Sequence, residues 1–236
     1  MAASPHQFDH PARLEARALG CVRGGRAVFQ ALDFALDAGG ALLLHGPNGT
    51  GKSSLLRILA GLLRPAGGHV LWNGAAIRDA VDDYCSQLHY VGHLDALKPL
   101  MTPRETLRFF AATRGEIALA DEALERLGVA GRADMPGRYL SAGQKRRVAL
   151  ARLIASRARL WLLDEPTVML DLDATARLEA LMGEHRASGG LVIVATHTAL
   201  ALPGAAWLDL AQFRPTTARR GNDGAGAAPS FEEETW

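Results

Sequence analysis

Short apolar runs and helical periodicity alternate along this chain. Residues 41–45, 160–163 and 191–195 form nearly continuous apolar runs of the length of a buried strand. After the first run, leucine and isoleucine recur at helical spacing from Leu55 to Leu63. Because buried strands that alternate with helices form parallel sheets covered on both faces, the pattern predicts an α/β fold with a mostly parallel central sheet. The last two runs should be central strands.

The segments between these runs predict a hairpin and a helical region. Residues 70–72 are apolar and are followed by Asn-Gly at 73–74, which favours the positive φ of a tight turn, so we expect a hairpin beside the main sheet. From about residue 95 to 159 the pattern is helical, and Thr-Pro-Arg-Glu at 102–105 matches a capping box with proline in the first turn. This stretch predicts a helical insertion into the sheet domain. A further helix is expected over 173–186.

Composition and charge exclude several classes of partner. The chain has 236 residues, of which 48% are hydrophobic, so it can build a real core in one large or two small domains. Lys and Arg together number 26 against 25 Asp and Glu, which leaves a net charge of +1. Such a balance provides no global field that would hold nucleic acid or an anionic membrane surface. We therefore expect no nucleic-acid partner.

The cysteines and the two ends of the chain bear on its environment. Cys21 and Cys85 stand too far apart for a C-x-x-C pair and offer neither a disulfide framework nor a zinc knuckle, which favours a reducing compartment. No signal-peptide core and no run of about 18 apolar residues occurs, so no membrane-spanning segment is expected. We expect residues 1–13 to be flexible and 214–236, rich in Gly, Ala, Thr and Arg, to be disordered.

A glycine-rich loop joins the first apolar run to the helix that follows it. Its sequence matches G-x-x-x-x-G-K-[ST], in which backbone N–H groups and a helix start surround phosphate oxygens. Lys52 would neutralise the β- and γ-phosphates, and the Ser53 hydroxyl would coordinate Mg²⁺. A glycine-rich turn with a chance lysine is disfavoured by the flanking strand and helix. The expected phosphate-binding residues are Gly46, Pro47, Asn48, Gly49, Thr50, Gly51, Lys52, Ser53 and Ser54.

Two carboxylates end the apolar run at 160–163. Asp164 and Glu165 would lie at the carboxyl end of a parallel strand, where open α/β sheets present ligand-binding residues. Asp164 is placed to hold Mg²⁺ through its hydration shell, and Glu165 can polarise the water that attacks a γ-phosphate. An acidic pair at a strand end can be only a solvated turn, but the preceding P-loop favours the catalytic interpretation.

A second anion-binding helix start is indicated further along the chain. Ser141 and Gln144 form S-x-x-Q before a periodic helix, which is at least a capping box and, with Gly143, a possible phosphate site. Because the chain already has its P-loop, a second phosphate-binding helix start implies a partner subunit. The basic residues at 145–147 can belong to a nucleic-acid patch, but a solvated helix face is the favoured interpretation.

These motifs together resemble a known family, the nucleotide-binding domain of ATP-binding-cassette (ABC) proteins, over roughly residues 14–210. The resemblance rests on segments taken in this order and spacing: Gly46 to Ser53, Leu140 to Gln144, Asp164-Glu165, Asp171 and Thr196-His197. It implies a P-loop NTPase fold with an N-terminal antiparallel β-subdomain and a helical subdomain at about 95–159. It also implies ATP and Mg²⁺ as cofactors.

The resemblance assigns roles residue by residue. Ser141 and Gly143, with Gln144 in the same signature motif, would contact the γ-phosphate held on the opposite protomer, and Asp171 would link the two sites. His197 matches the switch histidine and would be catalytic together with Lys52 and Glu165. Taken alone, a strand-end histidine more often hydrogen-bonds to backbone, but the accompanying motifs favour the switch role. Active sites would then be composite, formed by two copies of the chain.

The chain departs from the family pattern at two positions. His93 stands where the family has a glutamine that senses Mg²⁺ and the membrane partner. Arg23 stands 29 residues before Lys52, where an aromatic residue that stacks on adenine is usual. A guanidinium plane can also stack on a base, which leaves adenine selectivity open.

Further residues resemble one branch of the family, the haem-exporter ATP-binding subunits of bacterial cytochrome c maturation. They are the residues at 90–93, 97–99, 140–153 and 160–167. This resemblance implies integral membrane permease subunits as partners, a haem chaperone as an indirect partner, and a peripheral location at the cytoplasmic face of the bacterial inner membrane. Direct ligation of haem by His93 is a less favoured alternative, because no Cys-Pro motif lies nearby.

Three other functions remain as alternatives. The first is the ATPase subunit of another ABC exporter. The second is a soluble ABC ATPase of translation or DNA maintenance, for which we would expect tandem cassettes, a long coiled-coil insertion or a basic surface. The third is a nucleotide-binding regulator without turnover, which conflicts with the presence of Glu165 and His197.

Overall fold

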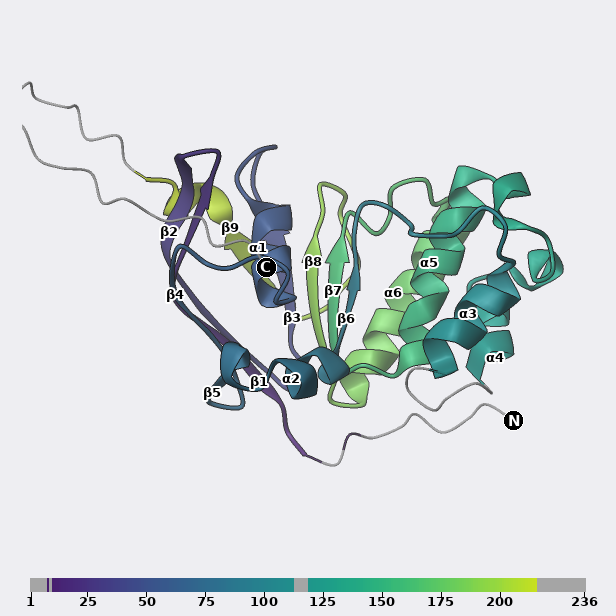
Figure 1. Cartoon of the computed structure of the whole chain (residues 1–236), viewed down its shortest axis with the longest axis horizontal. Coiled ribbons are helices and arrows are strands. Elements are labelled where there is room, and N and C mark those ends of the chain that lie inside the picture. The colour runs from purple at the N-terminus through teal and green to yellow at the C-terminus, as the bar shows by residue number, and fades with distance from the viewer. Residues whose placement is uncertain (1–7, 9, 113–118, 216–236) are drawn as a thin grey trace, which may run out of the picture.

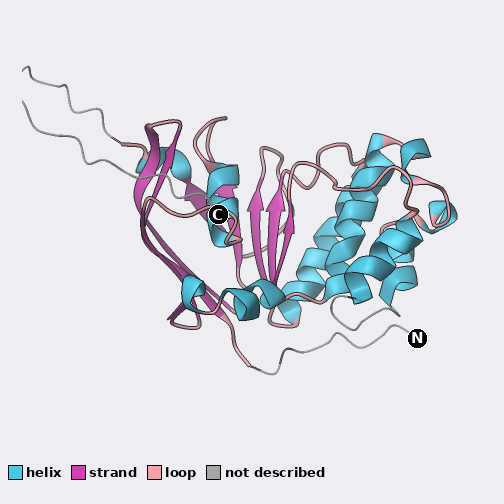
Figure 2. Cartoon of the chain, viewed as in Figure 1, coloured by secondary structure: helices cyan, strands magenta, loops and turns pink. Residues whose placement is uncertain are grey.

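The computed structural model describes residues 8, 10–112 and 119–215, which form two sheets and a group of helices (Figures 1 and 2). The strands are β1 (Arg13–Arg23), β2 (Arg26–Asp37), β3 (Ala41–His45), β4 (Gly67–Trp72), β5 (Ala75–Ala76), β6 (Leu88–Val91), β7 (Leu160–Asp164), β8 (Leu191–Ala195) and β9 (Ala206–Asp209). The helices are α1 (Lys52–Leu59), α2 (Val81–Gln87), α3 (Pro103–Ala112), α4 (Leu119–Arg126), α5 (Ala142–Ser156) and α6 (Leu172–Ala187). Short 3₁₀ turns are η1 (Ile77–Asp79), η2 (Ala130–Arg132), η3 (Gly137–Tyr139) and η4 (Leu210–Phe213).

The parallel sheet has the strand order β6-β7-β8-β3-β9, with every neighbouring pair parallel. The α/β fold and the central places of β7 and β8 are therefore confirmed. Successive side chains on these strands point to opposite faces, so Leu42 and Leu44 pack towards α1, whereas Leu43 packs with Leu178 of α6. In Figure 1, α1 lies between the two sheets, and α5 and α6 cover the other face of the parallel sheet.

The antiparallel sheet has the order β2-β1-β4-β5. The expected tight turn joins β4 to β5, with φ of 52° at Asn73 and 85° at Gly74, and pairs Trp72 with Ala75. The hairpin prediction is confirmed, although the hairpin belongs to this separate sheet together with β1 and β2. The N-terminal antiparallel subdomain implied by the family resemblance is thus present.

The helical region matches the predicted insertion, with α3, α4 and α5 packed against one another. The capping box of α3 is confirmed, because Thr102 N donates to Glu105 Oε2 at 2.8 Å and Glu105 N donates to Thr102 Oγ1 at 3.2 Å. The predicted extension of α1 to Leu63 is wrong. The helix ends at Leu59, because Gly61 turns the chain with a φ of 72° and leaves Leu62 exposed.

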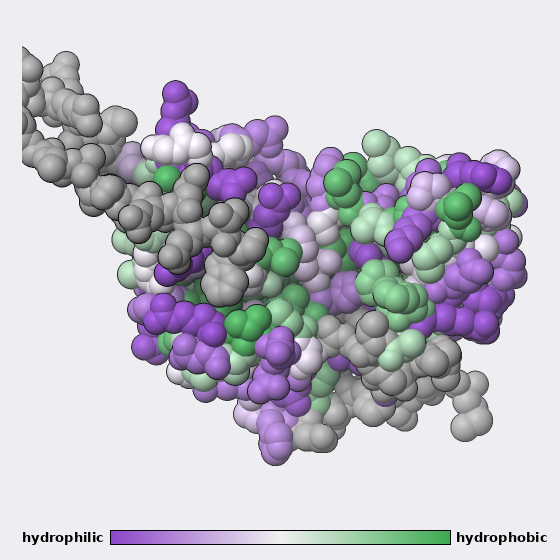
Figure 3. Space-filling model, viewed as in Figure 1, coloured by the Kyte–Doolittle hydropathy of each residue, from purple (hydrophilic) through white to green (hydrophobic). Residues whose placement is uncertain are grey.

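The predicted flexible and disordered ends lie mostly outside the described residues, since 1–7, 9 and 216–236 are not described. Phe8 N donates to Ser188 O at 3.2 Å, and the Arg159 guanidinium lies 4.9 Å from the centre of the Phe8 ring. Neither Cys21 nor Cys85 forms a disulfide. Among the helices in the described part of the chain, none is long and apolar enough to cross a membrane. Hydrophilic and hydrophobic residues are interspersed over the visible face of the molecule (Figure 3).

Candidate active site

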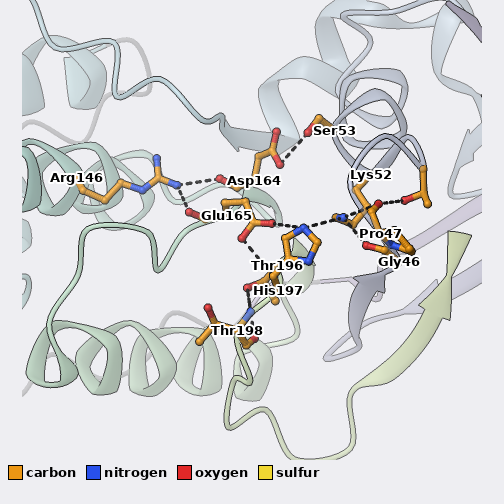
Figure 4. Close-up of polar contacts among 11 residues, drawn as sticks. Gly46, Pro47, Lys52, Ser53, Arg146, Asp164, Glu165, Thr196, His197 and Thr198 are labelled. Carbon is orange, nitrogen blue, oxygen red and sulfur yellow. Dashed lines mark hydrogen bonds and ion pairs between the residues drawn. The ribbon is translucent and has the colours of Figure 1, made fainter.

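The loop between β3 and α1 curls around the Lys52 ammonium. Three of its glycines, Gly46, Gly49 and Gly51, have φ of 130°, 80° and 99°, which residues with a Cβ rarely adopt. At Gly51 a Cβ would also lie 2.6 Å from the Val28 side chain. Lys52 Nζ donates to Gly46 O at 2.7 Å and lies 3.3 Å from a second loop carbonyl, that of Pro47 (Figure 4). The positive φ of these glycines therefore lets the loop fold around the Lys52 ammonium.

Lys52 is 7% exposed and lies close to the other two predicted catalytic residues, Glu165 and His197. Its Nζ lies 3.1 Å from His197 Nε2. Burial lowers the pKa of Lys52, and the Glu165 and Asp164 carboxylates oppose that shift by raising it. The ammonium is thus held between loop carbonyls and acidic side chains, where a polyphosphate would interact with it strongly.

Ser53 and Asp164 provide adjoining oxygen donors. Asp164, the last residue of β7, is 4% exposed, and its Oδ1 accepts a hydrogen bond from Ser53 Oγ at 3.1 Å. A hydroxyl beside a carboxylate is a hard-oxygen pair of the kind that Mg²⁺ prefers. The side chains present therefore fit the predicted metal.

Glu165 has an unusual backbone conformation, with φ of 48° for a residue that is not glycine. Its amide donates to Ala195 O at 2.8 Å, which ties it to the end of β8. His197, just beyond β8, donates from its backbone N to Glu165 Oε2 at 3.3 Å, and its Nε2 lies 3.6 Å from Glu165 Oε1. Figure 4 shows the His197 ring between Lys52 and Glu165.

These side chains line one cavity of about 640 Å³. The cavity is lined by Arg23, Val28, Asn48, Gly49, Gly51, Lys52, Ser53, Ser54, Asp164, Glu165, Val168, His197 and Thr198. The structure therefore brings most of the predicted phosphate-binding residues, both carboxylates, His197 and Arg23 together, whereas Gly46, Pro47 and Thr50 do not line the cavity. His93 follows β6, is exposed and does not line this cavity. Val28, Val168 and Thr198 were missed by sequence reasoning because they belong to no motif.

The signature residues lie at a second cavity of about 890 Å³. It is lined by Gly128, Val129, Gly131, Arg132, Ser141, Gly143, Gln144, Arg147, Met169, Leu170 and Asp171. The capping box is confirmed, since Ser141 N donates to Gln144 Oε1 at 3.0 Å and Gln144 N donates to Ser141 Oγ at 3.2 Å. No lining residue is shared with the cavity around Lys52.

Asp171 connects this second cavity to α6. Its Oδ1 accepts a hydrogen bond from Ala174 N at 2.9 Å and so caps the helix, and its other oxygen pairs with Arg147. The hydrogen bond from the Ala174 amide lowers the pKa of the carboxyl, and the Arg147 charge lowers it further. The carboxylate is thus kept ionised beside the signature motif.

The interpretation of residues 145–147 as a solvated basic face is wrong for Arg146. Its neighbours Lys145 and Arg147 are partly exposed, but Arg146 is 3% exposed. It donates hydrogen bonds to backbone carbonyls of the segment that contains Glu165 (Figure 4). Arg146 is buried because its position on α5 faces the sheet, whereas the positions on either side of it face partly outward.

A Gly-rich loop around a buried lysine, with a carboxylate pair at the end of a neighbouring parallel strand, defines a P-loop nucleotide-binding protein. The sequence profile of the ABC transporter family matches residues 29–168. Among solved structures, an ABC transporter ATP-binding protein from Pyrococcus furiosus aligns with a TM-score of 0.76 at 24% identity, over 86% of this chain and 100% of that one. The ATP-binding subunit of another ABC transporter aligns with a TM-score of 0.71 at 28% identity, over 78% of this chain and 79% of that one.

Several curated relatives carry the name cytochrome c biogenesis ATP-binding export protein CcmA. The relative from Paramagnetospirillum magneticum is 53% identical over 84% of this chain and 94% of its own length. The one from Rhodospirillum rubrum is 53% identical over 89% and 91%, and CcmA 1 from Salmonella typhimurium is 48% identical over 82% and 92%. The chain belongs to the ABC transporter family and, within it, to the CcmA proteins. It is an ATP-binding ABC-type transport ATPase.

Proposed function

We propose that the chain hydrolyses ATP to drive haem delivery for the maturation of c-type cytochromes. Its relatives are named for export and cytochrome c biogenesis, which supports this pathway. Its direct partners would be integral membrane permease subunits, with a haem chaperone as an indirect partner. It would lie peripherally at the cytoplasmic face of the bacterial inner membrane.

The observation that carries the proposed chemistry is the separation of the two cavities. The one around Lys52 contains the P-loop and both carboxylates, whereas the one around Ser141 contains a second capped helix start suited to an anion. Because the two cavities share no lining residue, we infer that a nucleotide bound at Lys52 does not reach the Ser141 helix start of its own chain. A symmetric pair of chains solves this, since a two-fold interface lets each Ser141 face the other chain's Lys52.

The residues around Lys52 have distinct tasks in such a site. Loop amides and the Lys52 ammonium bind the β- and γ-phosphates and stabilise charge that develops during transfer. The Ser53 hydroxyl and Asp164 carboxylate offer oxygens to Mg²⁺, which neutralises phosphate charge when bound. Glu165 accepts a hydrogen bond from the attacking water and orients it. His197, in contact with both Lys52 and Glu165, keeps that carboxylate turned towards the phosphate end.

The remaining predicted site residues extend the same scheme. Ser54 and Arg23 line the cavity around Lys52, so Ser54 would bind phosphate and the Arg23 guanidinium would stack on the base. Ser141 and Gly143, with Gln144 completing the capping box, would contact the γ-phosphate on the opposite chain. These assignments require a dimer with two bound nucleotides.

The membrane partner would meet the loop after β6 and the helical region. His93 is exposed there, and it lies beside Leu94, which is 81% exposed. Leu100 and Tyr139, at 74% and 63% exposure, present further apolar surface within the helical insertion. Exposed apolar side chains of this kind are typical of protein interfaces, which supports permease docking through His93 and its neighbours.

The proposal is tested in cells that lack this chain and are complemented with variants. Glu165→Gln keeps the side-chain shape but removes the carboxylate, so the purified variant should bind ATP and hydrolyse it at least ~100-fold more slowly. The complemented cells should then fail to mature c-type cytochromes, measured by haem staining of gels. Glu125→Gln, an exposed glutamate on α4, is the matched control and should behave as wild type.

The two readouts separate the alternatives. Normal c-type cytochromes in cells that carry an ATPase-deficient Glu165→Gln protein would contradict the haem role and favour another exporter. Full ATPase activity in the purified variant would contradict the catalytic assignment of Glu165 itself.

A further inference from the structure

All five N–H donors of the Arg146 guanidinium are used on backbone or carboxylate oxygens. Three go to the end of β7 and the residues that follow it. Nη2 donates to Asp164 O at 2.8 Å and to Glu165 O at 2.7 Å, and Nε donates to Pro166 O at 3.2 Å. One side chain therefore holds three consecutive carbonyls, those of Asp164, Glu165 and Pro166. Figure 4 shows the bonds to Asp164 and Glu165.

The other two donors reach the loop after β6. Nη1 donates to Gly92 O at 2.8 Å and to Asp95 Oδ1 at 3.1 Å. That loop contains His93, which we place at the contact with the membrane partner. The guanidinium thus spans the space between this loop and the segment that carries Glu165.

Burial makes this arrangement sensitive to geometry. The Arg146 side chain is 4% exposed, and the Asp95 carboxylate, 25% exposed, is its ion-pair partner among the described residues. A buried charge is stabilised only when its hydrogen bonds are made. The planar Arg146 guanidinium therefore cannot turn towards the Glu165 segment without losing hydrogen bonds to the loop after β6, or the reverse. Lysine could not replace it, because an ammonium has three donors and no fixed plane.

Glu165 needs such support. Its φ of 48° is costly for a residue with a Cβ and persists only where the surroundings impose it. We propose that Arg146 is a positioning residue that holds Glu165 in this conformation and ties it to the loop at 92–95. This inference rests on the proposed function, in which Glu165 orients the attacking water and that loop meets the membrane partner. A shift of the loop would then change the placement of the catalytic carboxylate.

The test compares Arg146→Lys with Arg152→Lys. Arg152 lies on the same helix and is 5% exposed, but it donates to Ala149 O and lies over Phe110, and among the described residues it forms no hydrogen bond with Glu165 or with the 92–95 loop. Arg146→Lys should lower kcat at least ~10-fold while the Kd for a fluorescent ATP analogue, measured without Mg²⁺, changes less than ~2-fold. Arg152→Lys should leave kcat within ~2-fold, even if both variants lose similar thermal stability.

Hydrogen exchange gives a readout that does not depend on activity. In the nucleotide-free full chain, Arg146→Lys should speed exchange both at the Glu165 amide and in the 92–95 loop, whereas Arg152→Lys should change neither. Asp95→Ala, which removes only the loop's carboxylate, should also speed exchange at Glu165. If Arg146→Lys fails to fold, the exchange rate at the Glu165 amide in Asp95→Ala alone tests the proposal.

Unchanged exchange at Glu165 in the folded variants would overturn the proposal, as would an equal loss of kcat in Arg146→Lys and Arg152→Lys. An inactive wild-type chain would count against the proposed function, yet the exchange experiment would still report on the link between Arg146 and Glu165.

Discussion

The His185 imidazole is buried in the core and stacks on Trp161, with ring centroids 3.9 Å apart and planes 7° from parallel. Burial lowers its pKa from 6.5 to about 4, despite hydrogen bonds with the Arg159 and Leu191 backbone that raise it. The unfolded chain therefore binds a proton below pH 6.5, whereas the folded chain does so only near pH 4. The stabilisation from neutral His185 is complete above pH 6.5 and is lost as the pH falls towards 4, by about 3 kcal/mol in all.

Urea unfolding between pH 7 and pH 4 measures this loss. His185→Phe keeps an aromatic ring against Trp161 but has no group that titrates, so its free energy of unfolding should fall less steeply over this window. Carboxylates contribute to acid sensitivity in both proteins and cancel in the comparison. Identical slopes for the two proteins would contradict the assignment to His185.

At the level of single residues, the motifs predicted which side chains have a chemical role, but they did not predict how deeply each side chain is buried or what it contacts. Lys52, Ser53, Asp164 and His197 were singled out by spacing, and they meet at one cavity. Arg146 was misjudged, because its burial depends on which side of α5 faces the sheet and on carbonyls far away in the sequence. A charge run alone contains neither piece of information.

At the scale of secondary-structure elements, two helical glycines should respond oppositely to the same substitution. A Cβ at Gly143 in α5 would lie 2.7 Å from Met169 O, so Gly143→Ala must separate these segments and should cost about 1–3 kcal/mol of folding free energy. A Cβ at Gly183 in α6 would meet nothing within 4 Å, so Gly183→Ala should stabilise the fold by up to about 1 kcal/mol. Urea unfolding of each variant measures the change in its free energy of unfolding. A lower value for both variants would contradict the open space described at Gly183.

Elements with strong local signals were predicted well, and those defined by pairing were not. The hairpin turn at 73–74 and the caps at Thr102 and Ser141 depend on neighbouring residues, which the sequence displays directly. The end of α1 was placed too late, because apolar spacing continues to Leu63 although the backbone turns at Gly61. The strands β1 and β2 came only from the family resemblance, since they are stabilised by their partners across the sheet.

At the scale of the whole molecule, composite sites predict that two inactive variants complement each other. Lys52→Ala damages the cavity around the P-loop, and Ser141→Arg fills the signature cavity on the other side of the proposed dimer. Each variant alone should lack ATPase activity. Mixed dimers contain one site with both mutations and one with neither, so mixing should restore roughly a quarter of wild-type turnover when pairing is random.

A second mixture controls for nonspecific rescue. Lys52 and Glu165 line the same cavity, so every site in a Lys52→Ala and Glu165→Gln mixture carries one of the two defects. That mixture should remain inactive. Equal recovery in both mixtures, or none in either, would contradict a site shared between two chains.

The sequence by itself determined the class of fold, the phosphate loop, the carboxylate pair and the signature cap, because each depends on residues that are close along the chain or on a repeating apolar period. Only the tertiary structure decided that Arg146 is buried beneath Glu165, that His93 lies outside the cavity around Lys52, and that the two phosphate-binding features occupy separate cavities. These facts depend on contacts between segments tens of residues apart, made when helices pack onto the sheet. No local pattern encodes the distance between such segments.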